Sequence, residues 1–330
     1  MILVTGGTGF VGSAVSSALY KKGVAVSATT RKSSDQIPAG VIPVPVNNLS
    51  DMAVDQASDT WNDLHNALKM TEVIIHTAAR VHVMNESVSD PLSEFRKVNV
   101  DATLSLARQA AAAGVKRFIF ISSIKVNGEM TEKGKPFTPD DVHVPNDPYG
   151  LSKYEAEQSL LKLAQETDMD VVIIRPPLVY GPGVKANFES MMKWINKGLP
   201  LPLGAVNNKR SLVALENLVS FILHCADIEN TPQAANQVFL ISDNEDVSTT
   251  QLLQKVARAF GKKARLLPVP VYLMKTAAKL IGKSAVADRL FGSLQVDSSK
   301  AQALLGWKPV VTMDEQLAKT VQAYQEQQHD

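Results

Sequence analysis

Three residues form a pattern suited to proton transfer at a hydroxyl or carbonyl group. Tyr149 and Lys153 are four residues apart, so on a helix they share one face. A free tyrosine titrates near about pH 10, and a neighbouring ammonium group favours the phenolate. We therefore expect Lys153 to lower the pKa of Tyr149. Ser123, just past an expected strand, can hydrogen-bond the reacting oxygen, and the set predicts acid–base catalysis by Tyr149.

A glycine-rich segment runs from Thr5 to Gly12, between an expected strand and an expected helix. Glycines at this spacing permit a tight turn, a close approach of the backbone to a pyrophosphate, and close packing of helix on sheet. The start of the helix then offers free N–H groups and a partial positive charge to the phosphates. This context predicts a dinucleotide site formed by Gly6, Gly9, Phe10, Val11 and Gly12.

The end of the second expected strand bears on which dinucleotide binds. An acidic residue there favours NAD, because it hydrogen-bonds the ribose hydroxyls and repels a 2′-phosphate. The sequence has Thr30 and Arg31 at this point and no acid before Asp35. Arg31 can pair with a phosphate through two parallel hydrogen bonds. We therefore expect NADP(H) to be favoured over NAD(H), with Asn48 and Leu49 near the adenine.

The elements that must position these residues alternate between strand and helix. Strands are expected at 2–5, 24–29, 41–46, 73–76, 118–122 and 171–174, and helices at 12–22, 98–113 and 149–167. Strands that are apolar on both faces, with helices between them, indicate a parallel sheet covered on both sides. The expected fold class is α/β, a Rossmann-like doubly wound parallel sheet.

The chain changes character after Arg175, where prolines and glycines become frequent and mark loops. We expect a dinucleotide-binding domain at 1–175, to which 210–242 returns with a helix at 215–226 and a strand at 238–241. A smaller, mostly helical C-terminal substrate-binding lobe is expected from 176–209 and 243–330.

Composition excludes several classes of protein. The 330 residues include 34 basic and 33 acidic ones, so no broad field of one sign attracts nucleic acid or an acidic membrane. The single cysteine, Cys225, rules out a disulfide framework, and the six histidines lack the spacing of metal ligands, so no metal is expected. No apolar run reaches the ~18–20 residues of a membrane span, and the opening strand does not read as a signal peptide. We expect a cytoplasmic protein.

Taken together, these motifs resemble the extended short-chain dehydrogenase/reductase superfamily, in its NAD-dependent epimerase/dehydratase branch. The resemblance spans most of the chain and rests on Thr5–Gly12, His76–Ala79, Asn99, Ser122-Ser123, Tyr149–Lys153, and Arg175-Pro176 to Tyr180–Gly183. It implies a dinucleotide on the large lobe and a nucleotide diphosphate-sugar, here a UDP-sugar, held by the small one. By similarity, the residues along the cofactor also include Thr77, Ala78, Ala79, Asn99, Tyr149, Lys153 and Pro176.

Three further positions match the branch as substrate contacts. Asn187 lies at the start of a helix that usually touches substrate, and Arg210 falls where an arginine meets the substrate diphosphate. Arg289 is a second candidate. Either arginine can form charge-assisted hydrogen bonds to a diphosphate, or can instead make an ordinary surface ion pair. The resemblance also implies a homodimer, formed through the helices expected at 98–113 and 149–167.

Departures from the branch narrow the expected activity. Dehydratases carry an acidic pair after the catalytic hydroxyl residue, whereas Ile124-Lys125 follows Ser123 here, so dehydration is disfavoured. Thr30 and Leu178 replace residues typical of galactose epimerases. The stretch 122–129 is most similar to reductases acting on UDP-4-keto-6-deoxy-N-acetylhexosamines. We expect such a 4-keto reductase, serving surface polysaccharide synthesis. The alternatives are a UDP-hexose or UDP-N-acetylhexosamine 4-epimerase, and a non-catalytic NADP(H)-binding protein.

Overall fold

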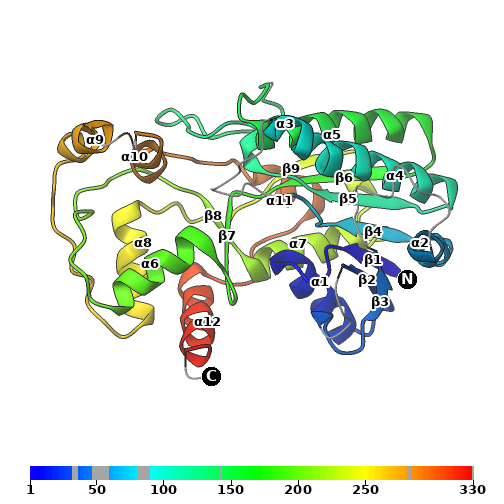
Figure 1. The fold of residues 1–330 in the computed structure, drawn as a ribbon, viewed down its shortest axis with the longest axis horizontal. Helices are drawn as coiled ribbons and strands as arrows, with labels where there is room; N and C mark the ends of the chain where they lie inside the picture. Colours follow the sequence, from blue (N-terminus) through cyan, green and yellow to red (C-terminus); the bar gives the residue numbers. More distant parts are fainter. Residues whose placement is uncertain are drawn as a thin grey trace.

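A computed structural model describes residues 1–31, 36–46, 59–80, 90–141, 143–280, 282 and 284–328. Its centre is a seven-stranded parallel sheet with the strand order β3-β2-β1-β4-β5-β6-β9 (Figure 1). The strands are β1 (Ile2–Thr5), β2 (Val26–Thr30), β3 (Ile42–Pro45), β4 (Val73–His76), β5 (Arg117–Ile121), β6 (Asp170–Arg175) and β9 (Val238–Leu240). The order reverses between β1 and β4, so the predicted doubly wound Rossmann-like fold is confirmed.

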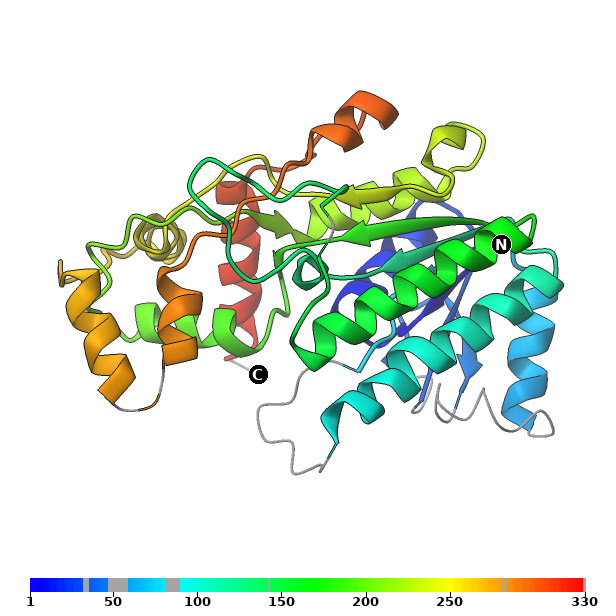
Figure 2. The same cartoon turned by 90° about the horizontal axis from the view of Figure 1, so that it is seen from above.

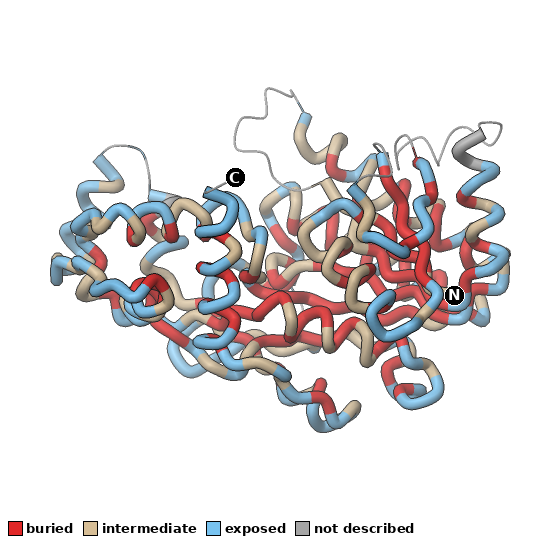
Figure 3. Tube along the Cα trace, turned by 90° about the horizontal axis from the view of Figure 1, so that it is seen from below, coloured by how far each residue is buried: buried red, intermediate tan, exposed pale blue. Residues whose placement is uncertain are grey.

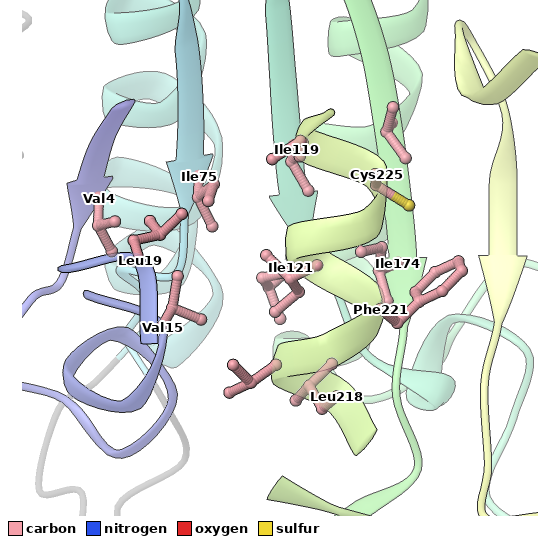
Figure 4. Packing of buried hydrophobic residues seen from close by; sticks show 14 of the residues in the cluster. Val4, Val15, Leu19, Ile75, Ile119, Ile121, Ile174, Leu218, Phe221 and Cys225 are labelled. Atoms are coloured by element: carbon pink, nitrogen blue, oxygen red, sulfur yellow. The ribbon is translucent and has the colours of Figure 1, made fainter. Parts of the chain in front are cut away.

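Alternate residues of each strand serve opposite faces of the sheet. On one face Leu3, Ile74, Phe118 and Ile173 belong to a core with α2 (Asp59–Lys69), α4 (Thr103–Ala112) and α5 (Pro148–Glu166). Figure 2 shows α4 and α5 side by side across this face. On the other face Val4, Ile75, Ile119 and Ile174 pack with α1 (Phe10–Lys21) and α7 (Leu215–Ala226) (Figure 4). The predicted homodimer through helices of the first face stays a prediction.

The helix predicted at 98–113 is part of a longer helical run. It consists of α3 (Pro91–Arg96), a π-helical turn η3 (Lys97–Ala102), and α4. Asp90 caps the first of these, since its side chain accepts a hydrogen bond from the backbone of the first turn. π-Helical turns are rare and are often found at functional sites. This one carries Asn99, an expected site residue.

A third apolar core lies beyond the carboxyl edge of the sheet, and we call the elements around it the small lobe. They are β7 (Leu178–Tyr180), β8 (Leu212–Ala214), α6 (Ala186–Asn196), α8 (Thr249–Ala259), α9 (Val271–Leu280), α10 (Ser284–Phe291) and α12 (Met313–Glu326). Figure 3 shows the sheet as the most continuously buried part of the chain. Helix α11 (Ser299–Leu305) packs on the sheet core instead, so we propose that it belongs with the large lobe.

A short strap from Gly292 to Val296 connects the two lobes. The Leu294 carbonyl accepts a 2.8 Å hydrogen bond from the Ser211 N–H on one side of the strap. On the other side the Gln295 carbonyl accepts one of 2.8 Å from the Phe137 N–H. The strap therefore lies between the loop after β5 and the segment that leads into β8. None of the helices in the described part of the chain is long and apolar enough to cross a membrane.

Candidate active site

The glycine-rich loop has the shape of a phosphate cradle. Gly6 has a φ of +72°, in the left-handed region that favours glycine. A Cβ added at Gly12 would lie 2.2 Å from the Gly6 carbonyl oxygen, so the helix approaches the loop too closely for any side chain. Gly9 caps α1 without a side-chain hydrogen bond, and no side chain therefore competes for the N–H groups of Phe10 and Val11. The residues present fit a dinucleotide pyrophosphate.

The loop after β4 lies against this cradle. The Thr77 hydroxyl donates a 2.6 Å hydrogen bond to the Thr5 carbonyl, and the backbone of Ala78 lies 2.9 Å from the position of a Cβ at Gly6. Ala79 continues the same loop and is half-buried. These residues therefore lie along one side of the phosphate loop, and their contact with the cofactor stays a prediction.

The predicted adenine and ribose contacts can be located only in part. Arg31 lies directly after β2 and is exposed, at the carboxyl edge where β1 also ends. This position is compatible with a contact to the adenosine half of a dinucleotide. Asn48 and Leu49 lie outside the described residues.

Ser123, Tyr149 and Lys153 converge at the carboxyl ends of β5 and β6. Asp147 and Pro148 start α5 just before Tyr149, because Asp147 caps the helix and proline suits its first position. The side chain of Tyr149 then lies beside that of Ser123, and their interaction favours the phenolate. One turn further along, the buried Lys153 donates a 3.0 Å hydrogen bond from Nζ to the Ile121 carbonyl. The arrangement can exchange a proton with an oxygen bound beside Tyr149.

The expected lowering of the Tyr149 pKa is wrong for the protein by itself. Burial and, to a smaller extent, the charge of Asp147 raise the pKa of Tyr149 to about 12, although the interaction with Ser123 opposes both effects. Burial also lowers the pKa of Lys153 to about 7, against the attraction of Glu157. The lysine is therefore partly neutral near pH 7 and supplies less positive charge to the tyrosine than the sequence suggested.

Behind the three residues lies a buried ion pair that sequence reasoning missed. The Arg175 guanidinium donates to both carboxylate oxygens of Glu157, at 3.0 Å from Nε to Oε1 and 2.5 Å from Nη2 to Oε2. Glu157 also accepts a hydrogen bond from the Ser122 hydroxyl. The spacing could have indicated that Glu157 belongs to the site, because it follows Lys153 by four residues and so shares its helix face. The pair joins α5 to the ends of β5 and β6.

The Asn99 side chain forms hydrogen bonds to two other parts of the protein. Its Oδ1 accepts a 2.9 Å hydrogen bond from the Arg80 N–H, and its Nδ2 donates to the Arg80 carbonyl and to the Ser152 hydroxyl at 3.1 and 3.0 Å. The amide thus ties the loop after β4 to the helix of Tyr149. Pro176, directly after β6, is buried, and its carbonyl accepts a 3.0 Å hydrogen bond from the Ile124 N–H.

The two arginine candidates lie together at the end of α10. Nη1 of Arg210 donates to the Arg289 carbonyl at 2.6 Å and to the Gly292 carbonyl at 3.3 Å. Burial lowers the pKa of Arg210, whereas the Arg289 side chain is exposed and lies 3.6 Å from Glu129. Asn187 is exposed in the first turn of α6.

A run of alternating charges crosses from the catalytic helix to α10. Nζ of Lys125 lies 3.0 Å from Asp147, 3.1 Å from Glu129, and 5.9 Å from the centre of the Tyr149 ring. Glu129 in turn faces Arg289. Arg289 of the small lobe is therefore linked through Glu129 and Lys125 to the surroundings of Tyr149. Among the described residues, no three His, Cys, Asp or Glu side chains gather in a way that would hold a metal ion.

Comparison with known proteins identifies the family of the chain. A model of the NAD dependent epimerase/dehydratase family matches residues 2–240 of the chain. The chain belongs to this family. It is 48% identical to the UDP-glucose 4-epimerase of Vibrio cholerae over 325 residues, which cover 98% of this chain and 95% of that protein. The resemblance expected from the motifs is thus confirmed, and the chain is an enzyme of the extended short-chain dehydrogenase type.

Two solved structures of family members share the fold. The UDP-glucose 4-epimerase of Thermotoga maritima, solved with UDP-glucose, superposes with a TM-score of 0.74 at 23% identity and covers 99% of both chains. That of Thermus thermophilus, solved with NAD, gives 0.74 at 22% identity and covers 98% of both. A nicotinamide dinucleotide is thus the expected cofactor of this family member. The predicted preference for NADP(H) finds no support in these comparisons.

Proposed function

We propose that this enzyme is a UDP-hexose 4-epimerase that retains NAD and interconverts UDP-glucose and UDP-galactose. The observation that carries the proposal is the 48% identity to a UDP-glucose 4-epimerase along nearly the whole of both chains. The sequence analysis gave the 4-epimerase as an alternative, and similarity of this extent favours the epimerase over the 4-keto reductase.

The proposed reaction needs one group that both takes and returns a proton at the sugar 4-oxygen. When bound, NAD supplies the acceptor and donor of the hydride at carbon 4. Tyr149 is the proton-transfer residue, because its phenol lies beside Ser123 at the carboxyl edge of the sheet. Burial favours the phenol, which donates, and the Lys125 ammonium, 5.9 Å from the centre of the ring, favours the phenolate, which accepts. Ser123 orients the sugar oxygen.

The remaining candidates would hold the two ligands. Gly6, Gly9 and Gly12 would hold the pyrophosphate of the dinucleotide, together with the N–H groups at the start of α1. Arg210 would bind the diphosphate of the substrate, since it is half-buried and its recorded partners are backbone carbonyls rather than a carboxylate. Asn99 would act by positioning the loop of Thr77–Ala79 and α5.

The 4-keto reductase is the second candidate, and Arg31 is the feature that favours it. An exposed arginine after β2 suits a 2′-phosphate, and a reductase must exchange its dinucleotide at every turnover. The two activities therefore differ in an observable way. An epimerase returns the hydride to its own substrate and needs no added dinucleotide.

The test combines cofactor content with turnover. The purified full-length protein is denatured, the released dinucleotide is assayed, and native protein is incubated with UDP-glucose alone. We expect NAD in near-stoichiometric amount and formation of UDP-galactose without added cofactor. Tyr149→Phe should retain NAD and lose at least about a hundredfold in turnover, the scale of general acid–base catalysis. Tyr154→Phe, on the same helix, is the matched control and should stay active.

The opposite result would favour the reductase. Protein that releases no dinucleotide, does not convert UDP-glucose, and oxidises NADPH with a UDP-4-keto sugar would contradict the epimerase. In that case Arg31→Ala should remove any preference for NADPH over NADH. If Tyr149→Phe left turnover unchanged, the proposed catalytic group would be wrong for either activity.

A further inference from the structure

Positive charge is concentrated in one short part of the chain. From Arg258 to Gly292 there are eight Lys or Arg residues and one acidic residue, Asp288, which gives a net charge of +7. The rest of the chain, with 26 basic and 32 acidic residues, carries −6. The near-zero net charge of the whole protein therefore hides a strongly basic segment.

The cations of this segment lie on the surface. Seven of the eight belong to the described residues, and each of these seven is exposed: Arg258, Lys262, Lys263, Arg265, Lys275, Lys279 and Arg289. Lys275 faces Asp288 at 3.4 Å. Within the described part of the chain, no acidic side chain lies within ion-pair distance of Lys263, Arg265 or Lys279. Arg258 and Arg289 also have acidic partners, Asp314 at 3.8 Å and Glu129 at 3.6 Å, so four of these seven cations are not neutralised locally by any described residue.

Exposed apolar side chains accompany these cations. On α9, Val271 and Met274 pack against the small-lobe core. The opposite side of the helix leaves Tyr272, Leu273 and Leu280 exposed at 68%, 48% and 83% of their surface. Because a helix turns about 100° per residue, these three side chains fall on one arc. Just before the helix, Leu267 is 51% exposed.

The same arc is flanked by lysines. Lys275 and Lys279 are one turn apart, so they form a row beside Tyr272. The outer side of α9 therefore combines a basic row with an apolar row, and neither contributes to the core. A helix of this composition, with lysines beside leucine and tyrosine, is typical of segments that lie in the interface of a lipid bilayer.

The position of the segment leaves it accessible. In Figure 1 the chain from the end of α8 to α9 forms the outer end of the small lobe, opposite the end that carries β3. Figure 3 shows much of this outer end as exposed. Helix α10 and the strap Gly292–Val296 follow directly, and the strap borders the site. A surface bound at α9 would therefore lie on the part of the small lobe that continues into α10 and Arg289.

We propose that the surface formed by Gly261–Leu280 docks on an anionic lipid bilayer, with α9 lying in the interface. Unneutralised cations attract anionic lipid headgroups, and the exposed leucines and tyrosine enter the boundary of the acyl chains. A second copy of the chain fits this surface poorly, because two patches of the same sign repel each other. Nucleic acid would engage the cations and leave the apolar row unused. The proposal does not depend on the epimerase activity.

The test is co-sedimentation of the full-length protein with vesicles. One set contains phosphatidylcholine alone, and the other contains phosphatidylcholine mixed with phosphatidylglycerol. We expect binding to the mixed vesicles only, weakening as salt is added. Lys275→Ala with Lys279→Ala should weaken binding about thirtyfold, from about 1 kcal/mol for each cation near an anionic surface. Leu273→Ser with Leu280→Ser should also weaken it, while the dependence on phosphatidylglycerol remains.

A matched control separates this surface from general charge. Lys21→Ala with Lys22→Ala removes two equally exposed lysines at the end of α1 and should leave vesicle binding unchanged. The unfolding midpoint of each variant shows that the fold is intact. Equal binding to both vesicle types, no binding to either, or an equal loss in the control would overturn the proposal. Lipid-free self-association that Leu280→Ser abolishes would assign the surface to a second copy instead.

Discussion

Replacing Glu157 by glutamine tests whether the buried ion pair holds the catalytic group in place. The Glu157 side chain is 0% exposed and that of Arg175 is 7% exposed. The substitution keeps the shape of the side chain and an oxygen that can accept from Ser122. It removes the charge that faces Arg175. Because no cavity is created, the effect reports on electrostatics rather than on packing.

The expected loss of stability is large because the substitution leaves the charge of Arg175 buried without a partner. Removing one partner of a buried ion pair leaves an uncompensated charge and costs about 3–5 kcal/mol. The Arg175 guanidinium keeps hydrogen bonds to Asn127 and Pro139, at 3.0 and 3.5 Å, which satisfy donors but not its charge. We therefore expect Glu157→Gln to lose about 3–5 kcal/mol of unfolding free energy. The turnover number should fall as well, since Ser122 directly precedes Ser123.

The assay is urea denaturation followed by fluorescence, together with steady-state turnover. Glu155→Gln is the matched control, because Glu155 lies on the same helix and pairs with the half-exposed Arg96 at the surface. That pair should be worth about 0–1 kcal/mol. If Glu157→Gln lost no more stability than the control and kept its turnover number, the reasoning about a buried charge would be refuted. Replacing both Glu157 and Arg175 by methionine should cost less stability than the single change.

Three further outcomes follow from the site. Gly12→Ala should abolish dinucleotide binding in calorimetry, because its Cβ would lie 2.2 Å from the Gly6 carbonyl. Burial lowers the pKa of His76 to about 3. Between about pH 6.5 and 3 the unfolded chain therefore binds one proton more than the folded protein, and stability falls as pH falls through this window. His76→Gln should flatten that part of a stability profile, and an unchanged profile would contradict the assignment. Burial lowers the pKa of Lys153 to about 7, so stability rises with pH from about 7 toward the ordinary lysine value. Lys153→Met should therefore lose turnover and yet be more stable than wild type at pH 7. The difference in unfolding free energy should shrink as pH rises. A difference that does not depend on pH would argue against a buried, titrating lysine.

Elements with a strong local signal could be predicted from the sequence. The observed bounds of β1, β4 and α7 are those expected, since each is an apolar run or a clear amphipathic pattern with defined ends. Helix α2 (Asp59–Lys69) was missed because most of its residues are polar, although the buried Leu64 and Leu68 follow a helical spacing. The three-residue strands β7 and β8 were also missed, since such short strands depend on pairing with each other rather than on periodicity.

In the site, too, the features that depend on a local motif were predictable, and those that depend on packing between elements were not. The glycine loop and the Tyr149–Lys153 spacing are local motifs, and they were predictable as such. The pairing of Glu157 with Arg175 joins two elements, so it depends on how α5 packs on the sheet. The direction of the Tyr149 pKa shift was wrong because burial is a property of the folded chain. The net charge of the whole chain likewise gave no sign of the basic segment at 258–292, because it does not show where along the sequence the charges lie.

The packing of Trp307 and α11 on the sheet core has a consequence for synthesis on the ribosome. Trp307 stacks edge-on against Phe221 of α7, with ring centres 5.0 Å apart, and Ala301 belongs to the same core. The apolar core between the sheet and α7 is therefore completed only when α11 and Trp307 have emerged, well after β9. A nascent chain ending after β9 would present the apolar face of α7 to solvent and to other chains. Residues 299–307 close the core of the large lobe, although the chain contributes to the small lobe both before and after them.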